Sequence, residues 1–296
     1  MDFTEPALRP PQEAHSLLLR ATQGCTYNDC NFCYVSRGYP FMAVTPEQME
    51  QEVLSQKPFF RPDTSIYLTG SNPFALSAEK LEEYLIVLRR HFPHFRELSM
   101  QSRIDDISRK SREELLHLHK MGLAQLYIGT ENGNDAVLRL MNKGYTSADA
   151  VEQLHRLDDA GIAYTTFYII GMGGRGVGTT SGKATAAMFN QVHPRRITTT
   201  GMTVFPHTPL ADMARDGLFV EASEREKIEE LLVFLEHLSV DTFYDGIHYL
   251  NPLNYRFANS NEMEKSRVLD DIRETLQTCS DEELEKMVNR KLMHSL

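Results

Sequence analysis

The sequence predicts an α/β fold with parallel strands. Six short apolar segments alternate with segments of helical periodicity, which favours a parallel sheet joined by right-handed helical crossovers. An internal echo supports this fold class, because residues 116–130 and 154–171 both show the end of an amphipathic helix, a glycine and an apolar strand. The expected strands lie near residues 16–21, 65–69, 96–101, 124–130, 163–170 and 196–202. Periodicity alone leaves open whether the sheet closes, stays partly open or is flat.

Helices are expected between these strands, and several of their starts carry capping signals. In "TPEQ", Thr45 is the expected N-cap, with Pro46 at the first helical position and Gln48 completing a capping box. "SREE" at 111–114 has the same arrangement. The expected helices lie near residues 46–57, 77–91, 112–121, 133–141, 147–160 and 181–192.

The pattern changes after about residue 205. Long charged helices are expected near 222–239 and 261–294, with an irregular stretch between them. We therefore expect an N-terminal arm, a core and a mainly helical C-terminal extension that covers one end of the core. Their expected ranges are 1–13, 14–205 and 206–296.

Composition narrows the class of protein. The 296 residues carry a net charge of −10 and no basic run longer than two, which argues against a nucleic-acid partner. No apolar run is long enough to span a membrane, and the first residues lack the apolar region of a secretory signal. Three of the four cysteines are clustered, which favours a reducing compartment over a disulfide framework. We therefore expect a cytoplasmic protein that does not act on a membrane.

The cysteine cluster is the strongest chemical signal in the chain. Cys25, Cys30 and Cys33 stand in "GCTYNDCNFC", a polar, turn-rich stretch whose spacing is C-x4-C-x2-C. Zinc would need a fourth ligand such as a histidine. A ferredoxin-like [2Fe–2S] carrier would need a fourth cysteine, and Cys279 is the remaining one. A [4Fe–4S] cluster held by three thiolates would leave one iron open to another ligand. The spacing by itself leaves these alternatives open.

The cluster and its surroundings resemble the radical S-adenosylmethionine (radical SAM) superfamily. The cysteines follow the first strand, Phe32 is interposed between the last two, and strand–helix repeats follow. The resemblance is greatest to the oxygen-independent coproporphyrinogen oxidase and Elp3-type group, although one extra residue stands in the first gap of the usual C-x3-C-x2-C spacing. It implies a partial (β/α)6 TIM-like barrel with one [4Fe–4S] cluster on Cys25, Cys30 and Cys33. SAM would bind the open iron.

Four further segments within 14–205 extend the resemblance to SAM contacts. "IYLTGSNPF" is similar to the second-strand glycine motif that receives the methionine amino group, and "SMQSRIDDI" to a strand that faces the cofactor. "LYIGTENGNDAVLRLMNKGYT" resembles a block with an acidic SAM contact, and "YTTFYIIGMGG" a segment that meets the adenine. With Phe32, the implied cofactor-binding residues are Thr69, Gly70, Ser71, Asn72, Ser102, Arg103, Glu131, Ile170, Gly171 and Met172.

The glycines in "GMGGRG" also match the dinucleotide-binding pattern G-x-G-x-x-G. That pattern needs an acidic residue about 20 positions later, and the chain has no Asp or Glu between Gly161 and Leu210. We therefore expect these glycines to let the loop pass close to a bound adenosyl group instead.

The resemblance implies an enzyme that reductively cleaves SAM to a 5′-deoxyadenosyl radical, which abstracts hydrogen from a small-molecule or peptide substrate. A reductase such as flavodoxin or ferredoxin would supply the electron. The alternatives are a non-catalytic haem- or cofactor-binding chaperone of the coproporphyrinogen oxidase-like group, or an iron–sulfur electron carrier. Tyr168 and His207 are the candidate catalytic residues, since both stand at or just past expected strand ends. For Tyr168 the competing interpretation is a packed core tyrosine.

Overall fold

The computed structural model describes residues 3–290, which form two compact units. Within this range, the first unit comprises residues 3–28, 35–128 and 156–164. The second comprises 29–34, 129–155 and 165–290. Each unit is described by itself below.

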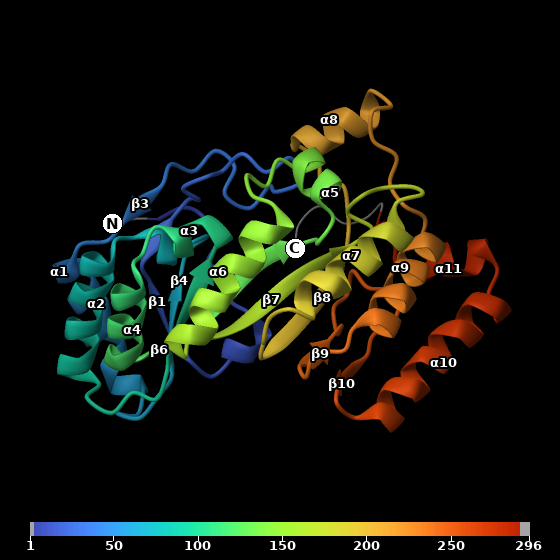
Figure 1. Ribbon diagram of the computed structural model, residues 1–296. Coiled ribbons are helices and arrows are strands. Elements are labelled where there is room, and N and C mark those ends of the chain that lie inside the picture. The colour runs from blue at the N-terminus through green and yellow to red at the C-terminus, as the bar shows by residue number, and fades with distance from the viewer. Residues whose placement is uncertain (1–2, 291–296) are drawn as a thin grey trace. The chain divides into compact units, whose positions relative to one another are not determined.

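All six expected strands are present, and the α/β fold class is confirmed (Figure 1). Parallel pairing joins β1 to β4, β4 to β5, β5 to β6, and β7 to β8. Every residue of β4 is buried, as expected for a parallel strand covered on both faces. The six strands are β1 (Leu17–Arg20), β4 (Ile66–Thr69), β5 (Leu98–Ser102), β6 (Leu123–Glu131), β7 (Ala163–Ile170) and β8 (Arg196–Gly201).

The stretch expected to be irregular contains two more strands of the sheet. β9 (Phe243–Asp245) pairs parallel with β8, and β10 (Arg256–Ala258) pairs antiparallel with β9. The expectation that this stretch is irregular was therefore wrong. Strands of three residues are too short to show the two-residue period of a strand in the sequence. The strand order is β1-β4-β5-β6-β7-β8-β9-β10, so the described sheet is open, with β1 and β10 at its ends.

A small ribbon flanks the cysteine segment in the first unit. β2 (Thr22–Gln23) pairs antiparallel with β3 (Met42–Ala43). It joins the residues just before Cys25 to those that follow the loop. Short 3-10 helices are η1 (Pro11–Glu13), η2 (Lys57–Phe59) and η3 (Pro73–Ala75).

The helices of the first unit follow the capping signals. Thr45 and Ser111 each form the expected capping box. α1 packs beside α2, and α2 beside α4 (Figure 1). The helices are α1 (Pro46–Gln56), α2 (Ala78–His91), α3 (Ile104–Ser108) and α4 (Arg112–Met121).

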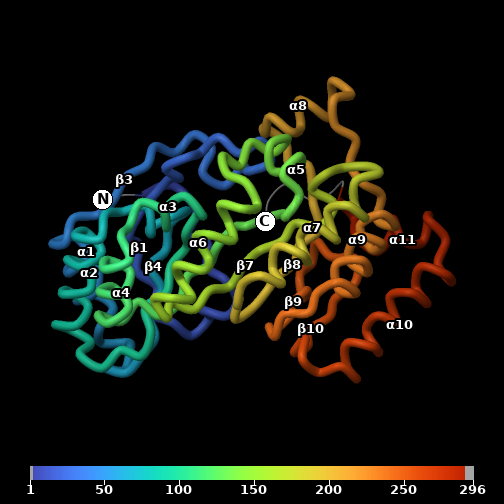
Figure 2. Tube along the Cα trace, in the orientation of Figure 1, coloured from blue at the N-terminus to red at the C-terminus, as the bar shows by residue number. Residues whose placement is uncertain are grey.

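The second unit is richer in helices, and α9 lies between α7 and α10 (Figure 2). α7 begins at Gly178, a few residues earlier than expected, and its Gly182 faces α9. A Cβ on Gly182 would lie 2.8 Å from the Glu230 carbonyl oxygen, so the close helix packing requires glycine. The helices assigned wholly to this unit are α5 (Asp135–Leu140), α7 (Gly178–Phe189), α8 (Pro209–Arg215), α9 (Glu224–His237), α10 (Glu262–Thr278) and α11 (Asp281–Met287). α6 (Ser147–Ala160) contributes residues to both units.

The long helix expected over 261–294 is two helices. α10 ends at Thr278 and α11 begins at Asp281, because Ser280 and Glu283 form a capping box that starts a new helix. The last residues of that expectation, 291–294, lie outside the described range.

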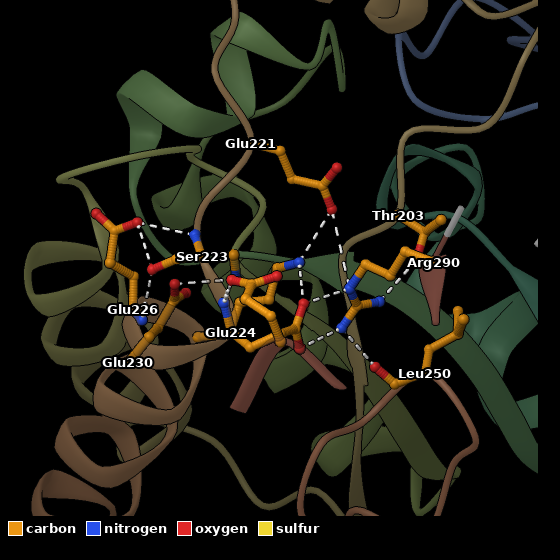
Figure 3. A network of polar contacts seen from close by, with 11 residues as sticks. Thr203, Glu221, Ser223, Glu224, Glu226, Glu230, Leu250 and Arg290 are labelled. Carbon is orange, nitrogen blue, oxygen red and sulfur yellow. Dashed lines mark hydrogen bonds and ion pairs between the residues drawn. The ribbon is translucent and has the colours of Figure 1, made fainter. Parts of the chain in front are cut away.

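A buried ionic network ties the end of the described chain to α9 within the second unit (Figure 3). Glu224, only 2% exposed, accepts hydrogen bonds from the Arg290 guanidinium at 2.5 and 2.8 Å and from Lys227 Nζ at 2.9 Å. Arg290 also donates to Thr203 and to the Leu250 carbonyl. Burial alone would raise the pKa of Glu224, but these cations hold it below its usual value.

Removal of Arg290 should leave Glu224 buried with a single cation. We expect Arg290→Met to lower the free energy of unfolding by about 3–5 kcal/mol, measured by chemical denaturation. Arg61→Met is the matched control, because the Arg61 side chain is 84% exposed and pairs with Asp63 on the surface. The control should cost less than about 1 kcal/mol. Equal losses in the two variants would contradict this interpretation of the network.

Candidate functional site

The three clustered cysteines are thiols in the structure, with none in a disulfide. Cys25 belongs to the first unit, whereas Cys30 and Cys33 belong to the second. Gly24 precedes the cluster with a φ of +74°, and a Cβ there would lie 2.6 Å from the Pro40 carbonyl oxygen. The entry into the cysteine loop therefore requires glycine.

In the first unit, the buried Asn72 holds the part of the loop next to Cys25. Its Oδ1 accepts from the Thr26 backbone N–H at 3.2 Å, and its Nδ2 donates to Thr26 Oγ1 at 2.8 Å. Nδ2 also lies 3.0 Å from Asp106 Oδ2. Burial raises the pKa of Asp106, although hydrogen bonds from the Arg103 N–H and from Asn72 oppose that rise. Asn72, which the sequence interpretation assigned to cofactor binding, thus also restrains the cysteine loop beside Cys25.

In the second unit, Asn31 anchors the part of the loop that carries Cys30 and Cys33. Its N–H donates to the Met141 carbonyl at 2.9 Å, and its Nδ2 donates to the Leu140 carbonyl at 2.7 Å. The Asn31 carbonyl in turn accepts from the Leu210 N–H at 2.9 Å. This segment is therefore fixed to the end of α5 and the start of α8.

The glycine motif after β4 has little room for other side chains. Gly70 has a φ of +142°, and a Cβ there would lie 2.1 Å from Thr22 Oγ1. Thr69 donates to the Leu8 carbonyl, and Ser71 donates to the Glu5 carboxylate. These contacts restrain the backbone of the motif, and the close approach to Thr22 requires glycine at position 70.

Gln101 is a candidate that the sequence interpretation missed. Its side-chain amide, oriented with the nitrogen facing the motif, donates to the carbonyl oxygens of Gly70 at 2.9 Å and Ser71 at 3.2 Å. Its signal in the sequence was only its place in "SMQSRIDDI", where Ser102 and Arg103 were singled out instead.

Ser102 and Arg103 lie at the end of β5, and both are buried. Ser102 Oγ donates to the Arg103 carbonyl at 2.8 Å. The Arg103 guanidinium lies 4.1 Å from the ring centroid of Tyr27 and donates to Asp105 at 2.8 Å. Tyr27 stands between Cys25 and Cys30, so Arg103 contacts the cysteine loop through a cation–π interaction.

Glu131 ends β6 in a strained conformation, with a φ of +61° that is uncommon for a non-glycine residue. It is 9% exposed and forms an ion pair with Lys143 at 3.2 Å. Lys143 Nζ lies 5.6 Å from the Phe32 ring centroid and 5.5 Å from that of Tyr145. The second unit therefore brings together the predicted residues Phe32 and Glu131.

Lys143 is the residue that joins this group, and the sequence interpretation did not assign it a role. It is 3% exposed, which is rare for a lysine without a specific partner. Its signal was its position in "NKGYT", within the quoted resemblance but outside the residues singled out.

Ile170 is the last residue of β7, Gly171 and Met172 follow it, and all three are buried. Gly171 has a φ of +80°, and a Cβ there would lie 2.8 Å from the Lys227 side chain. Its N–H donates to Glu230 at 2.9 Å. This segment is consequently held by α9.

Met172 is part of an apolar cluster in the second unit. The buried members include the flexible side chains of Met141 and Met202, and Phe32 packs against the cluster from its partly buried position. Two predicted cofactor residues therefore contact the same apolar group. The buried members are Val137, Met141, Met172, Met202, Leu210 and Phe219.

The two candidate catalytic residues have different surroundings. Tyr168 is fully buried and donates to Glu230 at 2.5 Å, and burial together with that carboxylate raises the pKa of the phenol. His207 is exposed in the turn before α8 and has a φ of +63°. Tyr168 is therefore a hydrogen-bond donor within the core, whereas His207 lies at the surface of the second unit.

The described residues fit the implied cofactors by their donor chemistry. Three thiols can ligate an iron–sulfur cluster, and two glycine turns leave backbone groups where a side chain would collide. Three buried polar atoms near these segments have no hydrogen-bond partner among the described residues, and a polar ligand or water could supply one. These atoms are Thr22 Oγ1, Asp106 Oδ1 and Asn132 Nδ2. Across residues 3–290, no group of three His, Cys, Asp or Glu residues is arranged to hold a single metal ion.

The chain belongs to the radical SAM superfamily. The model of the Radical SAM superfamily matches residues 19–178, which is more than half of the chain. The open, mostly parallel sheet described above is accordingly the α/β partial TIM barrel of this superfamily. No curated protein matches the chain at a significant level. Across residues 3–290, no helix is long and apolar enough to cross a membrane.

Solved structures of radical SAM proteins share the fold. Coproporphyrinogen III oxidase (HemN) from Escherichia coli matches with a TM-score of 0.58 and 18% identity, over 86% of this chain and 57% of its own. Elp3 from the archaeon Methanocaldococcus infernus has a TM-score of 0.53 and 14% identity, over 87% of this chain and 63% of its own. The methyltransferase TsrM from Kitasatospora setae, solved with cobalamin and a [4Fe–4S] cluster, has a TM-score of 0.55 and 19% identity, over 68% of this chain and 39% of its own. This chain thus spans less than two thirds of each of these proteins.

The free energy of unfolding should depend on pH because of the buried pair of Tyr168 and Glu230. Burial raises the pKa of Glu230 from 4.5 to about 7, so the folded protein binds this proton more tightly than the unfolded chain does. The contribution of this tighter proton binding to the free energy of unfolding is fully present below about pH 4.5. It is lost as the pH rises to about 7. Relative to Glu230→Gln, the wild-type protein should lose about 3 kcal/mol of unfolding free energy over that range.

Denaturant titrations at a series of pH values would measure this difference. Glu229→Gln, at the exposed neighbouring position, is the control and should follow the wild-type pH profile. Parallel profiles for wild type and Glu230→Gln would contradict the assignment of a buried, protonated carboxyl.

Proposed function

We propose that this chain is a radical SAM enzyme that uses one [4Fe–4S] cluster, bound by Cys25, Cys30 and Cys33, to cleave SAM reductively. The cluster and SAM together supply a 5′-deoxyadenosyl radical, which abstracts hydrogen from a small-molecule or peptide substrate. The observation that carries the proposal is the pair of hydrogen bonds between Asn72 and Thr26. They join the glycine motif after β4 to the cysteine loop, and SAM chemistry needs these two segments together.

The first unit supplies the groups for the methionine part of SAM. The rigid backbone of Thr69, Gly70 and Ser71 presents its carbonyl oxygens to an amino group, and Gln101 lies against two of them. Ser102 and Arg103 hold the next strand end against the cysteine loop through Tyr27. We assign these residues to binding and orientation, which is what the protein contributes to cofactor chemistry.

The second unit supplies the groups for the adenosine part. The backbone of Ile170, Gly171 and Met172 follows β7 with its conformation fixed by Glu230. We propose that Glu131, held by Lys143, orients a polar group of SAM, and that Phe32 and Met172 keep the surrounding site apolar. An apolar lining excludes water, which would otherwise allow side reactions of the radical.

Tyr168 and His207 are the residues we propose to act on the substrate. Burial and the neighbouring Glu230 carboxyl raise the pKa of the Tyr168 phenol and keep it protonated, and His207 offers an exposed imidazole in the turn before α8. We also propose that residues 14–205 form the enzyme's core, with 1–13 as an arm and 206–296 as the covering extension. A flavodoxin or ferredoxin in the cytoplasm is the proposed electron donor.

Anaerobic reconstitution with iron and sulfide tests this function directly. The wild-type protein should bind four iron and four sulfide ions, and on reduction it should convert SAM to 5′-deoxyadenosine. Triple replacement of Cys25, Cys30 and Cys33 by Ala should abolish both, because no thiolates remain in the loop. Iron analysis, the visible and EPR spectra of the cluster, and chromatography of the nucleoside products provide the measurements.

Cys279→Ala is the matched control, since Cys279 is the C-cap residue after α10 and its carbonyl accepts from Arg225 at 2.8 Å. This variant should keep the cluster and the SAM cleavage. Loss of the cluster in Cys279→Ala would indicate four-cysteine ligation and favour an electron carrier. Stoichiometric haem binding without SAM cleavage would overturn the enzymatic proposal in favour of a chaperone, and one bound zinc without iron would overturn it altogether.

A further inference from the structure

A buried carboxylate in the N-terminal arm, Glu5, lies at the meeting point of three functional segments of the first unit. It is 4% exposed and accepts three hydrogen bonds. Gly24 N–H donates to Oε2 at 2.8 Å, and the hydroxyls of Ser36 and Ser71 each donate to Oε1 at 2.8 Å. The two hydroxyl oxygens also contact each other, and because each hydroxyl has a single proton, it donates either to Glu5 or to the other serine.

These three donors flank the proposed cofactor site along the chain. Gly24 directly precedes Cys25, Ser36 comes three residues after Cys33, and Ser71 belongs to the glycine motif after β4. A single carboxylate therefore fixes both flanks of the cysteine segment and the motif assigned to the methionine part of SAM. Because bonds to a charged acceptor are roughly twice as strong as neutral ones, this contact restrains all three segments.

The arm itself is tied down around Glu5. Gln23 Oε1 accepts from the backbone N–H groups of Thr4 and Glu5, and Arg20 donates to the Glu5 backbone carbonyl at 2.6 Å. Among the described residues, no basic side chain forms an ion pair with the Glu5 carboxylate itself. Burial of a carboxylate without a cation is costly unless its hydrogen bonds are well satisfied. An arm that only covered apolar surface would have no need of such a group.

We infer that Glu5 is a positioning residue for the cluster and for SAM, so that the N-terminal arm is part of the cofactor site. The inference rests on the function proposed above. Glu5 sets the conformation of the backbone beside Cys25 and of Ser71. It also places a buried negative charge one residue away from a cluster ligand, which disfavours addition of an electron to the cluster. Loss of Glu5 should therefore weaken SAM binding and make the cluster easier to reduce.

Glu13 provides a matched control in the same arm. It is also a buried glutamate, 8% exposed, and its carboxylate accepts from Ser16, Ser99 and Tyr127. None of these partners flanks the cysteines or belongs to the glycine motif. Glu5→Gln and Glu13→Gln each replace a carboxylate by an amide of the same shape, which cannot accept all three hydrogen bonds.

The experiment compares wild type, Glu5→Gln and Glu13→Gln after anaerobic reconstitution. The measurements are the thermal midpoint of each apoprotein, the dissociation constant for SAM by equilibrium dialysis, and the midpoint potential of the cluster by EPR-monitored titration. Both variants should lower the thermal midpoint. Only Glu5→Gln should weaken SAM binding by about tenfold and shift the potential to a more positive value.

The outcomes separate this inference from the proposed function. If wild-type protein assembles no cluster and binds no SAM, the proposed function fails. If wild type does both, and Glu5→Gln matches wild type or Glu13→Gln in affinity and potential, only the role of Glu5 is wrong. Should Glu5→Gln fail to fold, Ser36→Ala removes one of its donors, and a severalfold weaker SAM affinity is then expected. An unchanged affinity in Ser36→Ala would overturn the inference.

Discussion

The cysteine loop is the part of the structure on which the candidate site depends. A short polar loop must lose considerable conformational entropy to hold three thiols in place. The structure offsets this loss with long-range hydrogen bonds to side chains and backbone. Asn72 holds the loop beside Cys25 in the first unit, and in the second Asn31 holds the segment of Cys30 and Cys33. Each of these two parts of the loop is therefore fixed within its own unit, which lowers the entropy cost of ordering that part when a ligand binds.

Buried carboxyl groups are the second recurring feature of the structure. Glu5 and Glu230 each accept a backbone N–H just beside a proposed cofactor segment, Gly24 in one case and Gly171 in the other. Burial of each carboxyl group costs desolvation free energy. The hydrogen bonds that each group accepts offset this cost, and they also fix a glycine turn. A glycine has no side chain to hold it, so a turn that must be both open and rigid needs an external acceptor. Glu224 serves a different purpose, because its cations join α9 to the end of the described chain.

The sequence was most informative where local chemistry decides the structure. Capping boxes at Thr45 and Ser111 are present as the residue spacing indicated, since a cap involves residues only three positions apart. The six core strands could be predicted, because each is an apolar segment followed by a segment of helical periodicity. The short strands β9 and β10 could not, because three residues carry no period and their pairing partners lie far away in the sequence.

The amino-acid sequence by itself determined the class of fold and several helix starts, because periodicity and caps are local properties. Its cysteine spacing and the resemblance to the superfamily predict a ligand set, Cys25, Cys30 and Cys33. The sequence also shows, in order along the chain, the glycine-containing strand ends that carry the resemblance to the superfamily. Only the tertiary structure decided which residues support that set. The sequence interpretation did not single out Gln101, Lys143 or Glu5, since their contacts are with residues that lie farther away in the sequence. A buried polar side chain is defined by what surrounds it, and those surroundings exist only once the chain has folded.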